Sequence, residues 1–211
     1  MSKEIIIIGA GGQARSITES VISNGFRIKY YVDKYKSSEN LFGYTIKKKL
    51  LIDKNNKVNI LIAIADNYKR EKIYKSIIEK YKNINFPNII DESAKISKFS
   101  QIGKGNMIMV NSLIGSNSHV TDFCLINNNV SIDHDCKINK FSSLAPSVVM
   151  GGNVNVGLRS SVGIGAIIMN NIKIGNDSLV GGSSYVNKDI KKLTVYYGIP
   201  AKFIRKINLN K

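Results

Sequence analysis

Residues 144–168 read LAPSVVMGGNVNVGLRSSVGIGAII, and in this stretch an aliphatic side chain returns at every sixth position. The same spacing runs from Ile90 to Val186 without a slip, and all seventeen positions hold Ile, Val, Leu or Met. A helix has a period of 3.6 residues and a flat sheet a period of two, so neither explains a period of six. A hexapeptide β-helix does explain it, because each hexapeptide forms one face of a triangular prism.

The β-helix predicts which residues become neighbours in space. Three hexapeptides make one coil of eighteen residues, and coils stack at the β-strand spacing of about 4.8 Å. Residues eighteen apart therefore lie side by side. Cys124 and Cys136 are twelve apart and occupy the small, inward position of the repeat. We interpret them as packing residues, not as a disulfide or a metal pair.

The chain before Pro87 has a different pattern. Short apolar runs at 4–8, 28–32 and 58–64 alternate with helical periodicity at 13–23 and 67–81. Strand–helix alternation predicts a parallel α/β sheet. No apolar run approaches the roughly 20 residues that span a bilayer, and the N-terminus has no signal-peptide layout. We therefore expect a soluble, cytoplasmic protein without membrane insertion.

The formal net charge is +16, and the excess of Lys and Arg lies in residues 1–90 and 190–211. Such a charge suggests nucleic acid, an anionic membrane or a polyphosphate ligand. Compositional drift is an equally plausible source, because Lys, Asn and Ile are abundant along the whole chain. Aromatic and basic residues do not interleave on one stretch, which argues against nucleic acid.

His134 is the main candidate for catalysis. It follows an inward aliphatic by two residues, so it points outward, and it lies between Asp133 and Asp135. A carboxylate beside an imidazole raises its basicity and fixes its tautomer, as a general base requires. One coil further on lies Gly152, whose backbone N–H could stabilise an oxyanion. The second histidine, His119, has no adjacent acid and is predicted to be a surface residue.

A glycine-rich loop, Gly9 to Arg15, connects the first predicted strand to the first helix. It fits the loose pattern Gly-x-Gly-x-x-Ala of dinucleotide-binding folds. Asp33 closes the second strand, where a ribose partner belongs. The segment has room for only half of a dinucleotide fold, so a mononucleotide or a nucleotide-linked sugar fits better than NAD. A loop that serves packing alone is the alternative.

Five stretches together resemble the bacterial nucleotide-sugar N-acetyltransferases and the related sialic acid O-acetyltransferases. They are IIIIGAGGQAR, LIAIADNYKR, INNNVSIDHDC, LAPSVVMGGNVNVG and GIPAKFIRK. The resemblance implies a half-Rossmann-like nucleotide-sugar domain (1–86), a left-handed parallel β-helix (87–190) and a tail near the CoA site (191–211). It also implies a homotrimer that uses acetyl-CoA and no metal.

The resemblance assigns roles to individual residues. It implies that His134 is the general base, that Asp135 orients it and that the Gly152 N–H polarises the thioester carbonyl. The nucleotide-sugar contacts are Gly11, Gly12, Gln13, Asp33, Asn67 and Arg70. Those near CoA, besides Gly152, are Pro200, Lys202, Arg205 and Lys206.

The expected reaction is acetyl transfer from acetyl-CoA to the amino group of a nucleotide-linked 4-amino-4,6-dideoxyhexose. We expect direct attack without an acyl-enzyme, because neither cysteine points outward. O-acetylation of a sialic acid-type sugar is the nearest alternative, since the sequence barely separates an amine from a hydroxyl acceptor. A non-enzymatic module that binds nucleotides is a third reading, which the His134–Asp135 pair disfavours. The nucleotide, UDP, dTDP, GDP or CMP, stays open.

Overall fold

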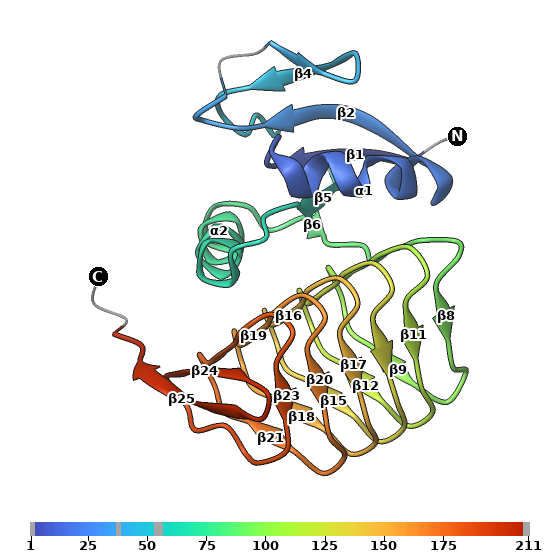
Figure 1. Ribbon diagram of the computed structural model, residues 1–211. Helices are drawn as coiled ribbons and strands as arrows, with labels where there is room; N and C mark the ends of the chain where they lie inside the picture. The colour runs from blue at the N-terminus through green and yellow to red at the C-terminus, as the bar shows by residue number, and fades with distance from the viewer. Residues whose placement is uncertain (1–2, 37–38, 53–56, 209–211) are drawn as a thin grey trace. The chain divides into compact units, whose positions relative to one another are not determined.

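The computed structural model describes residues 3–36, 39–52 and 57–208 (Figure 1). The chain divides into two compact units, the first ending at Glu92 and the second beginning at Ser93. The first unit contains both helices, and the second is built almost entirely from very short strands.

The first unit is a six-stranded sheet in the order β3-β4-β2-β1-β5-β6. Its centre is β1, which is parallel to both β2 and β5 and buries Ile5 to Ile8 completely or almost so. This central position explains why the run of four isoleucines shows no polar alternation. The elements are β1 (Lys3–Ile8), α1 (Gly12–Ser23), β2 (Phe26–Val32), β3 (Asn40–Leu41), β4 (Tyr44–Lys47), β5 (Val58–Ile62), α2 (Asn67–Lys80), β6 (Ile84–Asn85) and β7 (Ile89–Ile90).

The segment between β2 and β5 does not form a crossover helix among its described residues. It makes instead the small antiparallel pair β3 and β4, and β4 then adds to β2 in parallel. Helix α2 starts cleanly because the Asp66 side chain accepts the Lys69 N–H at 2.9 Å. Helix α1 starts at Gly11 without a side-chain cap. The predicted alternation of strands and helices in this unit is confirmed.

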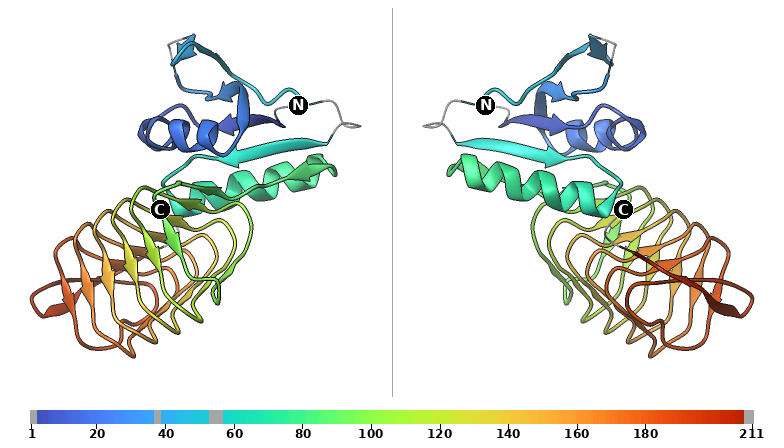
Figure 2. Two further views of the ribbon diagram at one scale, coloured as in Figure 1. Left: turned by 90° about the vertical axis from the view of Figure 1, so that its right-hand side faces the viewer. Right: turned by 90° about the vertical axis from the view of Figure 1, so that its left-hand side faces the viewer.

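The second unit confirms the predicted β-helix. Strands of two residues recur at six-residue intervals and pair in parallel with strands eighteen residues away, as Ile114 does with Ile96 and Ile132. From Ile108 to Val186 every aliphatic of the ladder is buried. The fold is a left-handed parallel β-helix, as the resemblance implies, and Figure 2 shows its coils stacked side by side.

Three sheets form the faces of the prism. Their orders are β25-β24-β22-β19-β16-β13-β10, β23-β20-β17-β14-β11-β8 and β21-β18-β15-β12-β9. The strands are β8 (Lys95–Ile96), β9 (Gln101–Ile102), β10 (Met107–Ile108), β11 (Leu113–Ile114), β12 (His119–Val120), β13 (Leu125–Ile126), β14 (Ser131–Ile132), β15 (Lys137–Ile138), β16 (Ser143–Leu144), β17 (Val149–Met150), β18 (Asn155–Val156), β19 (Ser161–Val162), β20 (Ile167–Ile168), β21 (Lys173–Ile174), β22 (Leu179–Val180) and β23 (Tyr185–Val186).

The corners of the prism require left-handed backbone. Non-glycine residues such as Asn117, Asp135 and Asn153 adopt φ values near +60° there. Asn and Asp tolerate this conformation better than most side chains. Cys124 and Cys136 are buried with free thiols inside the column, as expected for packing residues.

The C-terminal segment is more ordered than a tail. Strand β24 (Thr194–Gly198) continues the sheet beside β22, and β25 (Ala201–Lys206) folds back antiparallel to it. Among the described residues, neither helix has the length and apolar character needed to cross a membrane, and the longer one, α2, has 14 residues.

Candidate active site

His134 lies at the corner between β14 and β15. Its Nδ1 is 2.7 Å from Oδ2 of Asp135, and its own backbone N–H donates to Asp133 at 2.8 Å. The side chain is 60% exposed. The hydrogen bond to Asp135, with the negative charge of Asp133, raises the pKa of His134. Because Nδ1 is held by a carboxylate, Nε2 is the nitrogen that can exchange a proton with a reactant.

Asp135 is held from two sides. Its Oδ1 accepts a hydrogen bond from Nδ2 of Asn117 at 2.5 Å, and its Oδ2 faces the imidazole. The Asp135 backbone is left-handed, with φ of +59°, and its N–H donates to Ser116. The hydrogen bond from Asn117, followed by that from His134, lowers the pKa of Asp135. The carboxylate is therefore ionised and fixed in direction at neutral pH.

Gly152 lies directly against the imidazole, as the eighteen-residue spacing predicts. A β-carbon placed on Gly152 would be 2.5 Å from Cε1 and 2.6 Å from Nε2 of His134. The residue is buried, yet its N–H donates to no acceptor among the described residues. This N–H is therefore available to a ligand that reaches the corner. An amide donor beside a general base is the arrangement that acyl transfer needs.

The other predicted residues of the β-helix unit lie elsewhere. Pro200 forms the turn of the β24–β25 hairpin, and Lys202 and Arg205 are exposed on β25. This hairpin joins the sheet at β22, some coils beyond the His134 corner. His119 is half-buried on β12 and lines a hollow of about 650 Å³ together with Lys137 and Lys173.

The glycine-rich loop of the first unit contains one closely packed glycine and two glycines that have no close neighbour on the side where a side chain would be. Gly9 is left-handed, with φ of +103°, and a β-carbon there would meet the Ala63 carbonyl at 2.8 Å. Gly11 and Gly12 face open space, with no atom within 4 Å of such a carbon. Packing therefore explains why position 9 must be glycine. It gives no such reason at positions 11 and 12, where the choice of glycine reflects either a ligand that approaches the backbone or the conformational entropy of the loop. Gln13 is half-buried in the first turn of α1.

Asp33 organises the adjacent loops. Its Oδ2 accepts the Ala10 N–H and its Oδ1 the Tyr35 N–H, both at 3.0 Å. The carboxylate thereby ties the end of β1 to the end of β2. Oxygens at this edge retain lone pairs for a ligand, because each carboxylate oxygen accepts more than one hydrogen bond.

Asn67 and Arg70 are more buried than expected of ligand contacts. Arg70 is completely buried, and its guanidinium donates to the carbonyls of Ile64 and Ala65 at 2.8 and 3.0 Å. It also donates to Oδ1 of Asn67 at 2.6 Å. Both side chains thus shape the loop that follows β5. Their predicted contact with a nucleotide sugar stays a prediction.

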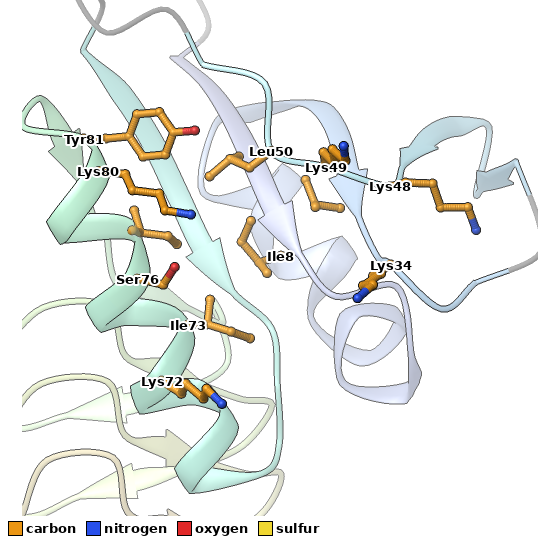
Figure 3. Close-up of a pocket in the computed structure, with 12 residues that line it drawn as sticks. Ile8, Lys34, Lys48, Lys49, Leu50, Lys72, Ile73, Ser76, Lys80 and Tyr81 are labelled. Atoms are coloured by element: carbon orange, nitrogen blue, oxygen red, sulfur yellow. The ribbon is translucent and has the colours of Figure 1, made fainter.

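The first unit has a lysine-lined groove that the sequence reasoning missed. Two adjoining hollows of about 760 and 650 Å³ share Ile8, Val32, Lys34, Lys48, Lys72 and Ile73. Figure 3 shows the larger one between α2 and the segment after β4, with Ile8 and Leu50 on its floor and lysines around it. It exists because no described helix covers the sheet beside β2. Its larger hollow has no carboxylate among its described lining residues, so it suits an anion with an apolar part.

Three comparisons with known proteins bear on this arrangement. Residues 4–77 match the family described as the PglD N-terminal domain. A histidine variant of the GDP-perosamine N-acetyltransferase of Caulobacter crescentus, in complex with CoA and GDP-perosamine, is 26% identical with a TM-score of 0.87. The alignment covers 98% of this chain and 99% of that one.

The chain is similar to nucleotide-sugar N-acetyltransferases along its whole length. This confirms the resemblance inferred from the sequence. The acetyltransferase domain of PglB from Neisseria gonorrhoeae shares the fold, with 22% identity, a TM-score of 0.88 and coverage of 97% of this chain and 100% of that one. Protein L142 of Acanthamoeba polyphaga mimivirus is 30% identical over 127 residues, which are 60% of this chain and 25% of the viral protein. The chain matches about a quarter of the length of that relative.

Proposed function

We propose that this protein transfers the acetyl group of acetyl-CoA to the amino group of a nucleotide-linked 4-amino-4,6-dideoxyhexose. The observation that carries the proposal is the contact of His134 with Asp135 on one side and Gly152 on the other. A base, an orienting carboxylate and an amide donor are the groups that direct acyl transfer requires. The similarity to an N-acetyltransferase crystallised with CoA and GDP-perosamine supports this reaction class.

The proposed steps follow from the atoms at this corner. The amine nitrogen bonds to the thioester carbon, and Nε2 of His134 takes the proton that the nitrogen loses. The Gly152 N–H donates to the oxyanion of the tetrahedral adduct, a contact worth about 3 kcal/mol in comparable sites. The C–S bond then breaks, and the imidazolium returns the proton to the leaving thiolate. Amide and free CoA are the products.

The first unit is proposed to hold the nucleotide part of the acceptor. Gly11 and Gly12 at the start of α1 would bring a β-carbon within 4 Å of no atom, so a phosphate can approach the backbone at this helix N-terminus. Asp33 lies at the edge where a ribose binds in such folds, and the neighbouring groove offers an apolar floor and lysines. Asn67 and Arg70 would act on this site by shaping the loop after β5.

A homotrimer is part of the proposal. On one face of the column the outward side chains of Val149 and Ile167 are adjacent and exposed, and Leu113 is exposed beyond Ser131, so this face is largely apolar. Such a face on a protein surface marks an interaction site. A second copy of the chain is its proposed occupant, with acetyl-CoA in the groove between subunits and the basic side chains of β25 near its phosphates. We place this reaction in the cytoplasm.

The test is a thiol-release assay with acetyl-CoA and a panel of acceptors that contains nucleotide-linked amino sugars and a sialic acid. Release only with a 4-amino-4,6-dideoxyhexose supports the proposal, whereas release only with a sialic acid favours O-acetylation. The His134→Ala variant should keep acetyl-CoA binding and lose about 10²- to 10⁴-fold in turnover, the usual contribution of a general base. His119→Ala is the matched control, because it removes the other histidine. Near-wild-type turnover by His134→Ala would refute the assignment of the base.

A further inference from the structure

Asn117 occupies the corner one coil before Asp135. Its backbone is left-handed, with φ of +58°, so its side chain projects at the same corner as that of Asp135. Its Nδ2 donates to Oδ1 of Asp135 at 2.5 Å, and the other oxygen of that carboxylate contacts Nδ1 of His134 at 2.7 Å. The three side chains therefore form one continuous line of hydrogen bonds.

The line matters because Asp135 is exposed. A carboxylate on the surface rotates freely, and nothing else among its described contacts fixes the plane of this one. With Asn117 in place, Oδ1 is occupied and Oδ2 is directed at the imidazole. We propose that Asn117 is a positioning residue for the His134–Asp135 pair, which it orients so that Nε2 is presented to the acceptor amine. Its importance for turnover rests on the function proposed above, but the contact does not.

The same corner contains a second hydrogen-bonded pair of side chains, with which the Asn117–Asp135 pair can be compared. Asn153 and Asn171 continue the column, and Nδ2 of Asn153 donates to Oδ1 of Asn171 at 2.8 Å. That pair has the same geometry and the same left-handed backbone, with φ of +58° and +64°. A purely structural role for Asn117 predicts that both pairs respond alike to substitution. A positioning role predicts that only the pair with Asp135 affects His134.

The first experiment measures the titration of His134 by NMR, which needs no substrate. The chain has two histidines, so His119→Gln assigns the signals. Asn117→Ser is the test variant, because Ser147 and Ser183 already occupy left-handed corners of this column. Asn171→Ser is the control. Asp133 and Asp135 are the charged groups that act on His134, and both remain in every variant.

The expected result is a fall in the pKa of His134 in Asn117→Ser toward its ordinary value, with no change in Asn171→Ser. Turnover should fall about tenfold, a fraction of the general-base contribution, while KM for both substrates stays constant. Asn117→Gly, which accepts positive φ without strain, repeats the test if the serine variant does not fold. An unchanged pKa overturns the proposal whether or not the protein acetylates any sugar. A shifted pKa with no activity toward any acceptor refutes the proposed function and leaves the positioning role standing.

Discussion

Replacing Gly152 by alanine is the sharpest test of the corner. Alanine keeps the backbone N–H, and Gly152 does not have the left-handed φ that would strain an L-residue. The new methyl carbon would lie 2.5 Å from Cε1 and 2.6 Å from Nε2 of His134. Carbon atoms in contact stay about 3.5–4.0 Å apart, so the imidazole must move by about 1 Å. The substitution thus displaces the base and leaves the amide donor intact.

The size of the effect follows from this displacement. A misplacement of about 1 Å of a reacting group costs about 10²-fold in rate, which equals about 2.7 kcal/mol in transition-state free energy. The cost to stability should be small, because the His134 side chain is 60% exposed and can swing into solvent. We therefore expect a hundredfold loss of turnover with an unchanged melting temperature.

The assay is thiol release at saturating acetyl-CoA, run beside a thermal melt. Gly182→Ala is the control, because Gly182 holds the equivalent position in a later hexapeptide and a β-carbon there would approach Ile164 O only to 3.2 Å. Turnover within twofold of wild type in Gly152→Ala would show that the imidazole need not lie over Gly152. A fall in melting temperature without a specific loss of turnover would mean that this glycine serves packing.

Three further predictions concern pH, the groove and an ion pair of the column. Since the base must be neutral and nearby carboxylates raise the pKa of His134, kcat/KM should fall on acidification through a midpoint above the ordinary value of 6.5; a midpoint at or below 6.5 in the pH–rate profile would contradict this. Lys48→Glu with Lys72→Glu should raise KM for the nucleotide sugar about tenfold by removing charge-assisted contacts, while KM for acetyl-CoA serves as the internal control; equal changes in both constants would exclude the groove. Arg159→Ala should reduce stability by about 3 kcal/mol, measured by thermal unfolding, with turnover unchanged. It removes the guanidinium whose nitrogens lie 2.6 and 2.9 Å from the carboxylate oxygens of Asp177, a side chain that is only 9% exposed; an unchanged melting temperature would show that this pair does not stabilise the column.

The β-helix could be predicted because an aliphatic residue marks its period of six in every hexapeptide. Each aliphatic from Ile108 to Val186 is buried for the same reason, so one rule covers the whole column. The β24–β25 hairpin was missed because the ladder stops at Val186 and the following residues have no period of six. The β3–β4 pair was missed for a similar reason, since strands of two and four residues are too short to show alternation.

The proposed catalytic corner was partly predictable because contacts in this fold have a fixed separation of eighteen. That rule connects His134 with Gly152, and it also connects Asn117 with Asp135. Asn117 was overlooked because asparagines occupy several left-handed corners for conformational reasons alone. A single asparagine therefore gave no signal of a role beside the base.

The first unit offered no comparable rule. The lysines of its groove come from separate segments, at 34, 48–49, 72 and 80, and only the fold brings them together. Arg70 was expected to face a ligand, although it lies three and seven residues before Ile73 and Ile77. Residues at these spacings share one face of a helix, which is consistent with the buried position of Arg70.

Fold and site in the second unit have one physical cause. The inward aliphatic side chains fill the interior of the column, and their spacing fixes the length of each coil at eighteen residues. The same spacing of eighteen residues places the imidazole of His134 over Gly152. One residue inserted between the two would turn the inward set outward and would also separate the base from the amide. An insertion of a whole coil outside this pair would alter neither relation. Selection for a packed core therefore also maintains the spacing of His134 and Gly152, and a rigid column suits the proposed reaction, which tolerates little misplacement of its base.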